Sequence, residues 1–325
     1  MGSLKKMLRV AVIGVGHLGN YHVQKYDALE GVDLVGVVDT DKKRVNEIAR
    51  LYDLKGYEDF SQIKGGVDAV SLAVPTERHF SMARDLLERG VHLLIEKPIT
   101  SRLEDADALI EMARAKDLVI QVGHVERFNP AVAAMEKMVT RPIFMESQRL
   151  HSFTKRGTDV DVVLDLMIHD LDIILHIVPS DVKELHAVGM SVITGKTDIA
   201  NARMIFENGA VANFTASRVS ANTVRKIRIF QRDSYLSVDC AKRRLNVTSL
   251  DGELTESAGS FPKVTSKMTY PESDPLADEI AAFVNSVNTG EKPVVSGEDG
   301  RKALMFAHAI IEQIEGGCKG FRTVC

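Results

Sequence analysis

Three consecutive residues, Glu96, Lys97 and Pro98, could do chemistry, because they directly follow an apolar segment that is typical of a buried strand. In an open parallel sheet, ligands bind in the crevice beyond the carboxyl ends of the strands. We therefore expect Lys97 to point toward a bound ligand, where its amine can hydrogen-bond a substrate hydroxyl and help to move the proton. Pro98 disfavours helix at Lys97 and can bend the chain there, a cis bond being one way to do so. A solvated surface lysine is the simpler alternative, and position alone does not separate the two.

A second pair of chemical groups, Asp165 and His169, lies in the apolar segment 162–177. Residues four apart share one face of a helix. A carboxylate beside an imidazole fixes its tautomer and raises its basicity, which suits general acid–base catalysis near neutral pH. Two other interpretations stay open, a satisfied core histidine and a metal site. We expect no metal, because no third and fourth ligand stand at a telling spacing.

A glycine pattern near the N-terminus, Gly14, Gly16 and Gly19, predicts a dinucleotide site. Gly14 permits a tight turn after an apolar run, Gly16 leaves the backbone open to a pyrophosphate, and Gly19 lets the next helix lie close to the sheet. Asp39 ends the following apolar run, where its carboxylate can bind a ribose 2′-hydroxyl. A glycine-rich surface turn would leave Asp39 unexplained. The acid favours NAD over NADP. Three basic residues weaken this preference: Lys42, Lys43 and Arg44.

Further residues are expected at the same crevice, because they end strands or flank the glycine turn. The additional predicted cofactor contacts are His17, Leu18, Ala73, Pro75, Thr76, His79, Glu96, Lys97 and Gln121. Thr76 can equally be no more than a helix N-cap. A second group is expected to hold substrate, with bidentate arginine contacts to a diphosphate as the strong ones. Its members are Lys97, Arg127, Asn129, Arg149, His151, Arg156 and His169.

The segments that must position these groups alternate between strands and helices over residues 7–122. This alternation predicts a doubly wound parallel sheet with helices on both faces, the α/β Rossmann architecture. The expected strands are 8–13, 33–38, 68–73, 92–95 and 118–122. The expected helices are 18–29, 41–52, 76–89 and 103–116.

The second half of the sequence has a different pattern. From residue 142 to about 260 it is dominated by β-type runs, and Asn208-Gly209 and Asp251-Gly252 suit hairpin turns. Helices are expected at 129–139, 162–177, 275–289 and 298–314. We therefore predict an α+β domain with an open, mainly antiparallel sheet. The predicted domains are 1–123, which binds NAD, and 124–325, which binds substrate and mediates oligomerisation.

The composition argues against several other classes of protein. The chain carries 41 basic and 45 acidic side chains, a net charge of −4, and no long basic block, so nucleic-acid binding is unsupported. The 3 cysteines are far apart and form no CxxC motif, which fits a reducing compartment. Without a signal segment or a membrane-length apolar run, we expect a cytoplasmic protein with no membrane partner. The open sheet predicts a homo-oligomer, a dimer or a tetramer.

These motifs resemble the Gfo/Idh/MocA family, named after glucose–fructose oxidoreductase and inositol dehydrogenase. The resemblance rests on the glycine turn, the Glu96-Lys97-Pro98 motif, the Asp165/His169 pair and the C-terminal helical pair, so it covers essentially the whole chain. It implies a Rossmann domain, an open-sheet substrate domain, and oxidation or reduction of sugar or cyclitol hydroxyls with NAD or NADP. It also implies that Lys97 lies by the reacting carbon and that Asp165 and His169 are catalytic.

Segments 123–130, 148–151 and 165–170 look more like the UDP-N-acetylglucosamine 3-dehydrogenase branch of this family. Met167 stands where many members have glycine, which argues against a simple inositol enzyme. The resemblance implies NAD-dependent oxidation of C3 of a UDP-N-acetyl-hexosamine to the 3-keto sugar. His169, oriented by Asp165, would take the hydroxyl proton while Lys97 stabilises the oxygen, or the two roles would be exchanged.

Three other functions are compatible with the same motifs. They are a dehydrogenase of a free sugar or cyclitol, a glycosidase that retains NAD and returns the hydride in each cycle, and a dinucleotide sensor without catalysis. A sensor has no need of Lys97, Asp165 and His169, which argues against it. The arginines near the domain junction mildly favour a phosphorylated or nucleotide-linked substrate over a free sugar.

Overall fold

The computed structural model describes residues 7–64, 66–154, 160–250 and 263–321. The chain divides into two compact units. The first comprises Met1–Val125 and Asp274–Arg301, and the second comprises Glu126–Ser273 and Lys302–Cys325. Among the described residues, no helix is both long enough and apolar enough to cross a membrane.

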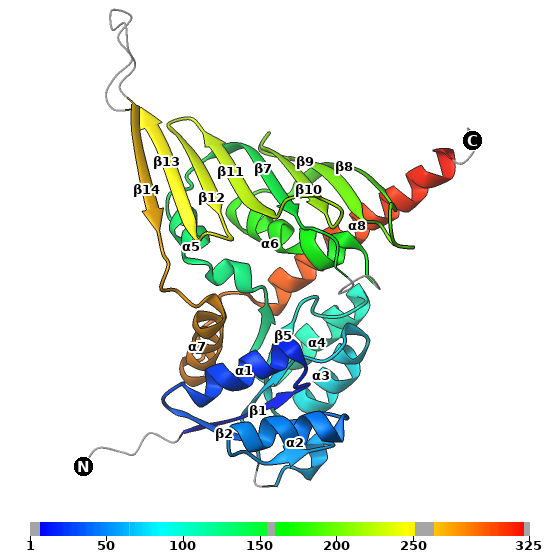
Figure 1. The fold of residues 1–325 in the computed structure, drawn as a ribbon, viewed down its shortest axis with the longest axis vertical. Coiled ribbons are helices and arrows are strands. Elements are labelled where there is room, and N and C mark those ends of the chain that lie inside the picture. The colour runs from blue at the N-terminus through cyan, green and yellow to red at the C-terminus, as the bar shows by residue number, and fades with distance from the viewer. Residues whose placement is uncertain (1–6, 65, 155–159, 251–262, 322–325) are drawn as a thin grey trace, which may run out of the picture. The chain divides into compact units, whose positions relative to one another are not determined.

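A six-stranded sheet forms the centre of the first unit, in the order β3-β2-β1-β4-β5-β6 (Figure 1). Its strands are β1 (Leu8–Ile13), β2 (Val32–Val38), β3 (Gly56–Tyr57), β4 (Ala69–Leu72), β5 (His92–Glu96) and β6 (Ile120–Gly123). All neighbouring strands are parallel, which confirms the predicted architecture. Parallel strands end at the same edge of a sheet, so the glycine turn after β1, the loop after β4 and Lys97 after β5 share one edge.

Helices alternate with these strands. They are α1 (His17–Asp27), α2 (Lys42–Leu51), α3 (His79–Glu88), α4 (Leu103–Ala115) and α7 (Pro275–Thr289), with 3-10 turns at Phe60–Gln62 and Thr76–Arg78. Local sequence sets where they begin. The Asp41 side chain caps α2 by accepting hydrogen bonds from the N–H groups of Lys43 and Arg44. Glu104 and Asp105 lie in the first turn of α4, where the helix dipole favours negative charge.

Helix α7 belongs to the first unit, although the sequence predicts that everything after residue 123 forms a second domain. Its buried residues Ile280, Phe283 and Val284 share one hydrophobic core with Val10 and Val12 of β1. Full burial of such a side chain stabilises a fold by about 1.5–3 kcal/mol. The second unit therefore begins close to the expected boundary, at Glu126, but the chain returns to the first unit over Asp274–Arg301.

An eight-stranded sheet forms the second unit, in the order β14-β13-β12-β11-β7-β10-β9-β8. Its strands are β7 (Pro142–Leu150), β8 (Val182–Met190), β9 (Ile199–Phe206), β10 (Val211–Ser217), β11 (Val224–Gln231), β12 (Ser234–Asp239), β13 (Arg244–Leu250) and β14 (Lys263–Thr269). Only β7 and β10 pair in parallel, so the predicted, mainly antiparallel sheet is confirmed. Asn208 and Gly209 turn β9 into β10 as expected, and Gly209 has a φ of +84°. The Asp251-Gly252 turn lies outside the described residues.

Helices cover one face of this sheet (Figure 1). They are the 3-10 turn Val125–Phe128, α5 (Pro130–Glu136), the π-helix Val163–Met167, α6 (Ile168–Ile177) and the later part of α8 (Gly297–Phe321). Alternate strand residues such as Ala202, Met204 and Phe206 form one core with these helices. Their sequence neighbours face the other side, on which no described helix of this unit packs.

Three features of the elements differ from the sequence prediction. The strand β3 is only 2 residues long, and β14 follows a segment outside the described residues; neither was expected. The helix expected over 162–177 exists, but it begins as a π-helix rather than as an α-helix. Asp165, one of the predicted catalytic residues, lies within this π-helix.

Candidate active site

The glycine turn between β1 and α1 has the geometry that a dinucleotide phosphate requires. Gly14 has a φ of +84°, and a β-carbon on it would lie 2.5 Å from the carbonyl oxygen of Ala73. A β-carbon on Gly19 would overlap the carbonyl oxygen of Gly14, whereas one on Gly16 would meet nothing within 4 Å. The fold itself therefore requires Gly14 and Gly19, while Gly16 borders open space beside the N-terminus of α1. An anion is stabilised there by the free N–H groups of the helix end.

Asp39 follows β2 and faces the glycine turn. Its Oδ2 accepts a hydrogen bond from the N–H of Val15 at 2.9 Å, and its Oδ1 accepts one from the N–H of Asp41 at 2.9 Å. The side chain is only 10% exposed, and the Arg44 guanidinium lies 3.7 Å from Oδ2. A carboxylate offers about four acceptor positions, so Asp39 keeps capacity for ribose hydroxyls. The glycine turn and Asp39 together fit NAD.

Asp39→Ala is expected to weaken NAD binding and to narrow the preference for NAD over NADP. The substitution removes an acceptor for the ribose and the charge that repels a 2′-phosphate. Loss of a charge-assisted hydrogen bond costs about 1.5–3 kcal/mol, which corresponds to a Kd for NAD that is roughly 10–150-fold higher. Calorimetric titration with both cofactors measures this, and Arg44→Gln is the matched control that should weaken only NADP. A wild-type protein that prefers NADP contradicts the prediction.

Two other predicted cofactor contacts begin α1. His17 and Leu18 are exposed, and the His17 ring packs edge-on against Tyr21 with 5.1 Å between ring centroids. Both side chains therefore stand at the helix end that faces a phosphate, and their contact with the cofactor stays a prediction.

The loop after β4 lies beside the glycine turn, since the N–H of Ala73 donates to the carbonyl oxygen of Ile13. Pro75 precedes the 3-10 helix Thr76–Arg78 as its N-cap, so Thr76 is not the capping residue that the simpler interpretation makes it. His79 is fully buried, and its ring nitrogens lie 3.0 Å and 2.9 Å from the carbonyl oxygens of Pro98 and Val74. The described partners of His79 are thus two loop backbones, and a direct cofactor contact stays a prediction.

Lys97 directly follows β5, and the peptide bond between Lys97 and Pro98 is cis. The Glu96 side chain before it is buried, with Oε1 2.9 Å from Nε2 of His22 in α1. Lys97 therefore leaves an anchored strand end, at the same sheet edge as the glycine turn. Gln121 in β6 is fully buried and donates through Nε2 to the carbonyl oxygen of Glu279 in α7 at 2.9 Å. This bond gives Gln121 a role in packing, and its contact with the cofactor stays a prediction.

Asp165 and His169 lie where the π-helix passes into α6. The N–H of Ile168 donates to the carbonyl oxygen of Val163, five residues earlier, which is the bond that defines the wider turn. Such π turns occur frequently at functional sites. His169 is partly buried, whereas Met167 is fully buried. The sharing of one helix face by Asp165 and His169 stays a prediction.

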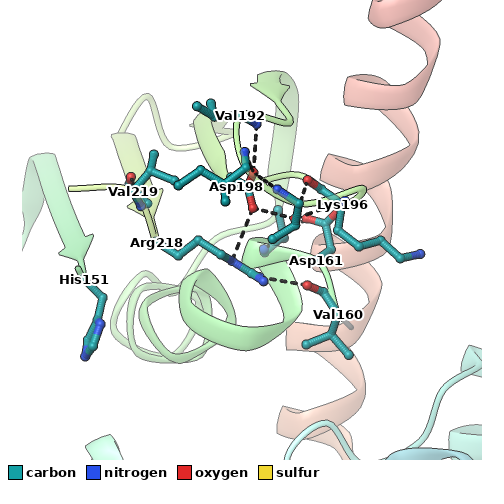
Figure 2. A network of polar contacts seen from close by, with 12 residues as sticks. His151, Val160, Asp161, Val192, Lys196, Asp198, Arg218 and Val219 are labelled. Atoms are coloured by element: carbon teal, nitrogen blue, oxygen red, sulfur yellow. Dashed lines mark hydrogen bonds and ion pairs between the residues drawn. The ribbon is translucent and has the colours of Figure 1, made fainter. Parts of the chain in front are cut away.

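A polar network ties the segment before this helix to the loops beside β9 and β10 (Figure 2). Arg218 is 5% exposed and donates through Nη2 to the carbonyl oxygen of Val160 at 2.8 Å. The N–H of Val162 donates to the carbonyl oxygen of Thr197 at 3.1 Å. These bonds fix the backbone directly before the π-helix to the loops beside β9 and β10.

Asp198 organises the loop that precedes β9 in the same network (Figure 2). Its Oδ2 accepts hydrogen bonds from the N–H groups of Val192, Ile193 and Thr194 at 2.8, 2.6 and 2.8 Å. Burial on its own raises the pKa of Asp198, but the Thr194 hydroxyl and these N–H groups outweigh burial and hold the pKa well below its ordinary value. The carboxylate is therefore charged in the folded protein.

Asp198→Asn is expected to lower the free energy of unfolding at pH 7 by about 1–3 kcal/mol, because the amide loses the charge that strengthens these bonds. The native pKa is lower than the unfolded one. The stabilisation is therefore present above the unfolded pKa, roughly 3.9, and is lost as the pH falls through the native pKa. Melting temperatures of the wild type and the variant should begin to approach one another as the pH falls below about 4. Asp233→Asn, at an exposed position, is the control. A stability difference between the wild type and Asp198→Asn that stays constant with pH would contradict the prediction.

Arg149, a predicted diphosphate ligand, is surrounded by carboxylates of the second unit. It is 4% exposed, with Nη2 2.7 Å from Oδ1 of Asp170 and Nη1 2.9 Å from Oε1 of Glu126. Burial alone raises the pKa of Glu126, but Arg149, Arg225 and Asn129 outweigh it and lower the pKa. The charge of Arg149 thus balances two buried acids, and a contact of Arg149 with substrate stays a prediction.

Arg127 and Asn129 have partners of the same kind. Nη1 of Arg127 lies 3.6 Å from Oδ1 of Asp172, and both side chains are 2% exposed. Asn129 caps α5 by accepting from the N–H of Ala131 at 3.2 Å, and donates to the carbonyl oxygen of Cys240 at 2.9 Å. Both residues therefore contribute to the architecture of the second unit, and a substrate contact is untested.

Two residues near this cluster are more exposed. His151, just after β7, is half-buried, and its Nδ1 lies 2.6 Å from the carbonyl oxygen of Ser152. Arg225, which the sequence does not single out, has a 42% exposed side chain and lies 3.7 Å from Oε1 of Glu126. The pairing of β11 with β7, which puts Arg225 opposite Arg149, brings it to this cluster. Arg156 lies outside the described residues.

Comparison with known proteins agrees with this geometry. Residues 8–124 match an oxidoreductase family with an NAD-binding Rossmann fold, and residues 137–236 match the GFO/IDH/MocA C-terminal domain. The chain is 37% identical over 313 residues to UDP-N-acetylglucosamine 3-dehydrogenase of Acidithiobacillus ferrooxidans, covering 95% of this chain and 97% of the relative. A solved structure of that enzyme covers 95% of this chain and 98% of its own, with a TM-score of 0.88.

More distant relatives have the same organisation. Myo-inositol 2-dehydrogenase of Thermotoga maritima is 25% identical over 333 residues, covering 95% of this chain and 96% of the relative. The structure of scyllo-inositol dehydrogenase of Lactobacillus casei, with bound NAD(H) and scyllo-inositol, is 19% identical, covers 96% of this chain and 98% of its own, and has a TM-score of 0.80. At this identity the likeness concerns the fold alone.

Proposed function

The chain belongs to the Gfo/Idh/MocA family of NAD-binding oxidoreductases, and from this premise we propose that it oxidises the C3 hydroxyl of a UDP-N-acetyl-hexosamine to the 3-keto sugar. The observation that carries the proposal is the 37% identity, over nearly the full length of both chains, to a UDP-N-acetylglucosamine 3-dehydrogenase. Lys97, Asp165 and His169 are all present for the chemistry.

The geometry of the first unit supports the proposed cofactor contacts. The N-terminus of α1 holds the pyrophosphate, Gly16 leaves room for it, and Asp39 binds the ribose hydroxyls. NAD supplies the hydride acceptor, and the protein supplies position and electrostatics. The remaining predicted contacts, from His17 to Gln121, are kept as part of this proposal.

Lys97 and His169 divide the proton chemistry between them. His169, oriented by Asp165, takes the proton of the sugar hydroxyl, because imidazole is basic enough near neutral pH. Lys97 hydrogen-bonds the hydroxyl oxygen and stabilises the negative charge that develops on it. The exchanged assignment, with Lys97 as the base, requires an amine whose pKa is lowered by burial or neighbouring positive charge.

The diphosphate of the substrate requires cationic side chains that are accessible and can still donate hydrogen bonds to it. Of the predicted group, His151 is partly accessible, while Arg127 and Arg149 face Asp172 and Asp170. We propose that Arg225 joins His151 and Arg156 in this role, because its guanidinium is partly exposed beside the same cluster.

The decisive experiment incubates the purified protein with NAD and UDP-N-acetylglucosamine, and follows NADH formation and the product by mass spectrometry and NMR. A 3-keto nucleotide sugar supports the proposal. UDP-N-acetylgalactosamine, free N-acetylglucosamine and myo-inositol are parallel substrates, and turnover of only a free sugar or cyclitol overturns it. Sugar release without net NADH identifies a glycosidase, and NAD binding without any turnover identifies a sensor.

We also propose a homo-oligomer that is formed through the open face of the eight-stranded sheet. Phe144, Phe230 and Tyr235 form an aromatic row on that face, with 5.5 Å and 4.8 Å between successive ring centroids, and Phe230 is 37% exposed. Exposed apolar clusters of this kind mark association surfaces. Analytical ultracentrifugation should find a dimer or tetramer that Phe230→Glu dissociates, and a monomeric wild type contradicts the proposal. We further propose that the protein works in the cytoplasm, and the buried free thiol of Cys240 supports this location.

A further inference from the structure

A chain of hydrogen bonds crosses the buried centre of the first unit, from α1 to the end of β5. The Tyr26 hydroxyl lies 2.9 Å from Oγ of Ser71, that Oγ lies 3.1 Å from Nδ1 of His22, and Nε2 of His22 lies 2.9 Å from Oε1 of Glu96. None of these four residues is more than 8% exposed. Buried polar groups are costly unless they are bonded, so the chain of bonds is a fixed part of the fold.

One assignment of the protons satisfies every member. Burial raises the pKa of Tyr26 well above its ordinary value, so the phenol keeps its proton and donates to Ser71. Ser71 then donates to Nδ1 of His22, and the Nε2–H of His22 donates to the carboxylate of Glu96. Tyr26 acts as a donor, while Ser71 and the imidazole each use one donor and one acceptor. The direction of these hydrogen bonds thus holds His22 in the tautomer whose Nε2–H points at Glu96.

Two neighbours confine Glu96 from other sides. A β-carbon on Gly123 would lie 2.9 Å from the carboxyl carbon of Glu96, so the carboxylate rests on the backbone of β6. Glu279 of α7 is fully buried, and its carboxylate lies with the ligand atoms of His22 and Glu96 inside a 4.8 Å cluster. The trio has residue types that bind metals, but both nitrogens of His22 are engaged by Ser71 and Glu96. The bond from His22 and the contact with Gly123 therefore fix the place of the Glu96 carboxylate.

We propose that His22 is a positioning residue that sets the place of Lys97 relative to the bound cofactor. The helix α1 presents the phosphate site at its N-terminus, and Glu96 is the residue immediately before Lys97. The bond between His22 and Glu96 thus links the helix that holds the cofactor to the strand end that carries the amine. This inference rests on the proposed function of Lys97 as a group that acts on substrate. A shift of about 1 Å at a reacting group can lower a rate 10²-fold.

His22→Leu is expected to lower kcat roughly 10–100-fold, with little change in the Kd for NAD, because the glycine turn and Asp39 are untouched. His22→Gln should recover most of the turnover, since its amide can donate to Glu96. Val23→Ala is the matched control: Val23 is the next residue and fully buried, so the variant loses packing on the same helix and should melt earlier at unchanged kcat. Ser71→Ala is a milder break in the chain, for use if His22→Leu does not fold.

A readout without substrate separates this inference from the proposed function. Reductive methylation with isotope-labelled formaldehyde labels Lys97 in the NAD-loaded protein, and Lys97→Arg assigns its NMR resonance. The resonance should move in His22→Leu and return in His22→Gln, whichever alcohol the enzyme oxidises. If it does so while UDP-sugars are not oxidised, the proposed function fails and the inference stands. An unmoved resonance in His22→Leu, or in Ser71→Ala where that replaces it, or an equal loss of turnover in Val23→Ala, overturns the inference.

Discussion

Lys97→Ala and His169→Ala should each lower kcat about 10²–10⁴-fold at saturating substrate, because in the proposed mechanism one group takes the hydroxyl proton and the other stabilises the negative charge on the oxygen. The affinity for NAD should fall far less, since the glycine turn and Asp39 remain. Steady-state NADH formation measures kcat, and calorimetric titration measures cofactor binding. The variant that removes the general base should also lose one limb of the pH–rate profile. This result decides whether His169 or Lys97 is the base.

Two further variants make this result specific. His186→Ala is the control for the histidine, because its side chain is 70% exposed and should be dispensable. Asp165→Asn should lower kcat less than His169→Ala, since the proposed mechanism gives Asp165 only the role of orienting the imidazole. Near-normal turnover in both Lys97→Ala and His169→Ala would falsify the catalytic assignment.

Arg149→Met should lower the free energy of unfolding by about 3–5 kcal/mol, because it leaves buried carboxylates without their cation. Arg149 bonds both Asp170 and Glu126, which are 2% and 8% exposed. Burial raises the pKa of Asp170, and Arg149 opposes this. In the variant both carboxyl groups should therefore have native pKa values above the unfolded ones. The folded state then binds more protons than the unfolded state, so its stability should rise as the pH falls.

Urea denaturation of the wild type and the variant at pH 5 and pH 8 tests both parts of this prediction, and the deficit should be larger at pH 8. Arg225→Met is the matched control, since its half-exposed guanidinium should contribute no more than about 1 kcal/mol. If Arg149→Met is instead as stable as the wild type and raises only the KM for the nucleotide sugar, Arg149 is the diphosphate ligand that the sequence predicts.

Local rules explain why the first unit could be predicted closely. The strand expected at 33–38 is Val32–Val38, and the helix expected at 103–116 is Leu103–Ala115. Backbone conformation at Gly14, close approach at Gly19 and the end of a buried strand at Glu96 are all encoded within a few residues. The same rules predicted the Asn208-Gly209 hairpin in the second unit.

The sequence did not predict which polar side chains find a partner far away along the chain. Arg149 and Asn129 looked like free polar groups in the sequence, but they face Asp170 and the carbonyl oxygen of Cys240. No local pattern marks an arginine as balanced by acids elsewhere in the chain. The π-helix at Val163–Met167 was missed because its apolar residues fit an α-helix equally well.

The sequence by itself determined the Rossmann architecture, the open antiparallel sheet, the phosphate turn with its acid, and the residues that are candidates for proton transfer. Only the tertiary structure decided which polar groups are engaged with one another, and that α7 returns to the first unit. The physical reason is that the partners are far apart along the chain. His22 and Glu96 are separated by 74 residues, and Gln121 and Glu279 by 158. Spacing in the sequence encodes local backbone geometry, whereas these pairs are selected by the packing of whole elements.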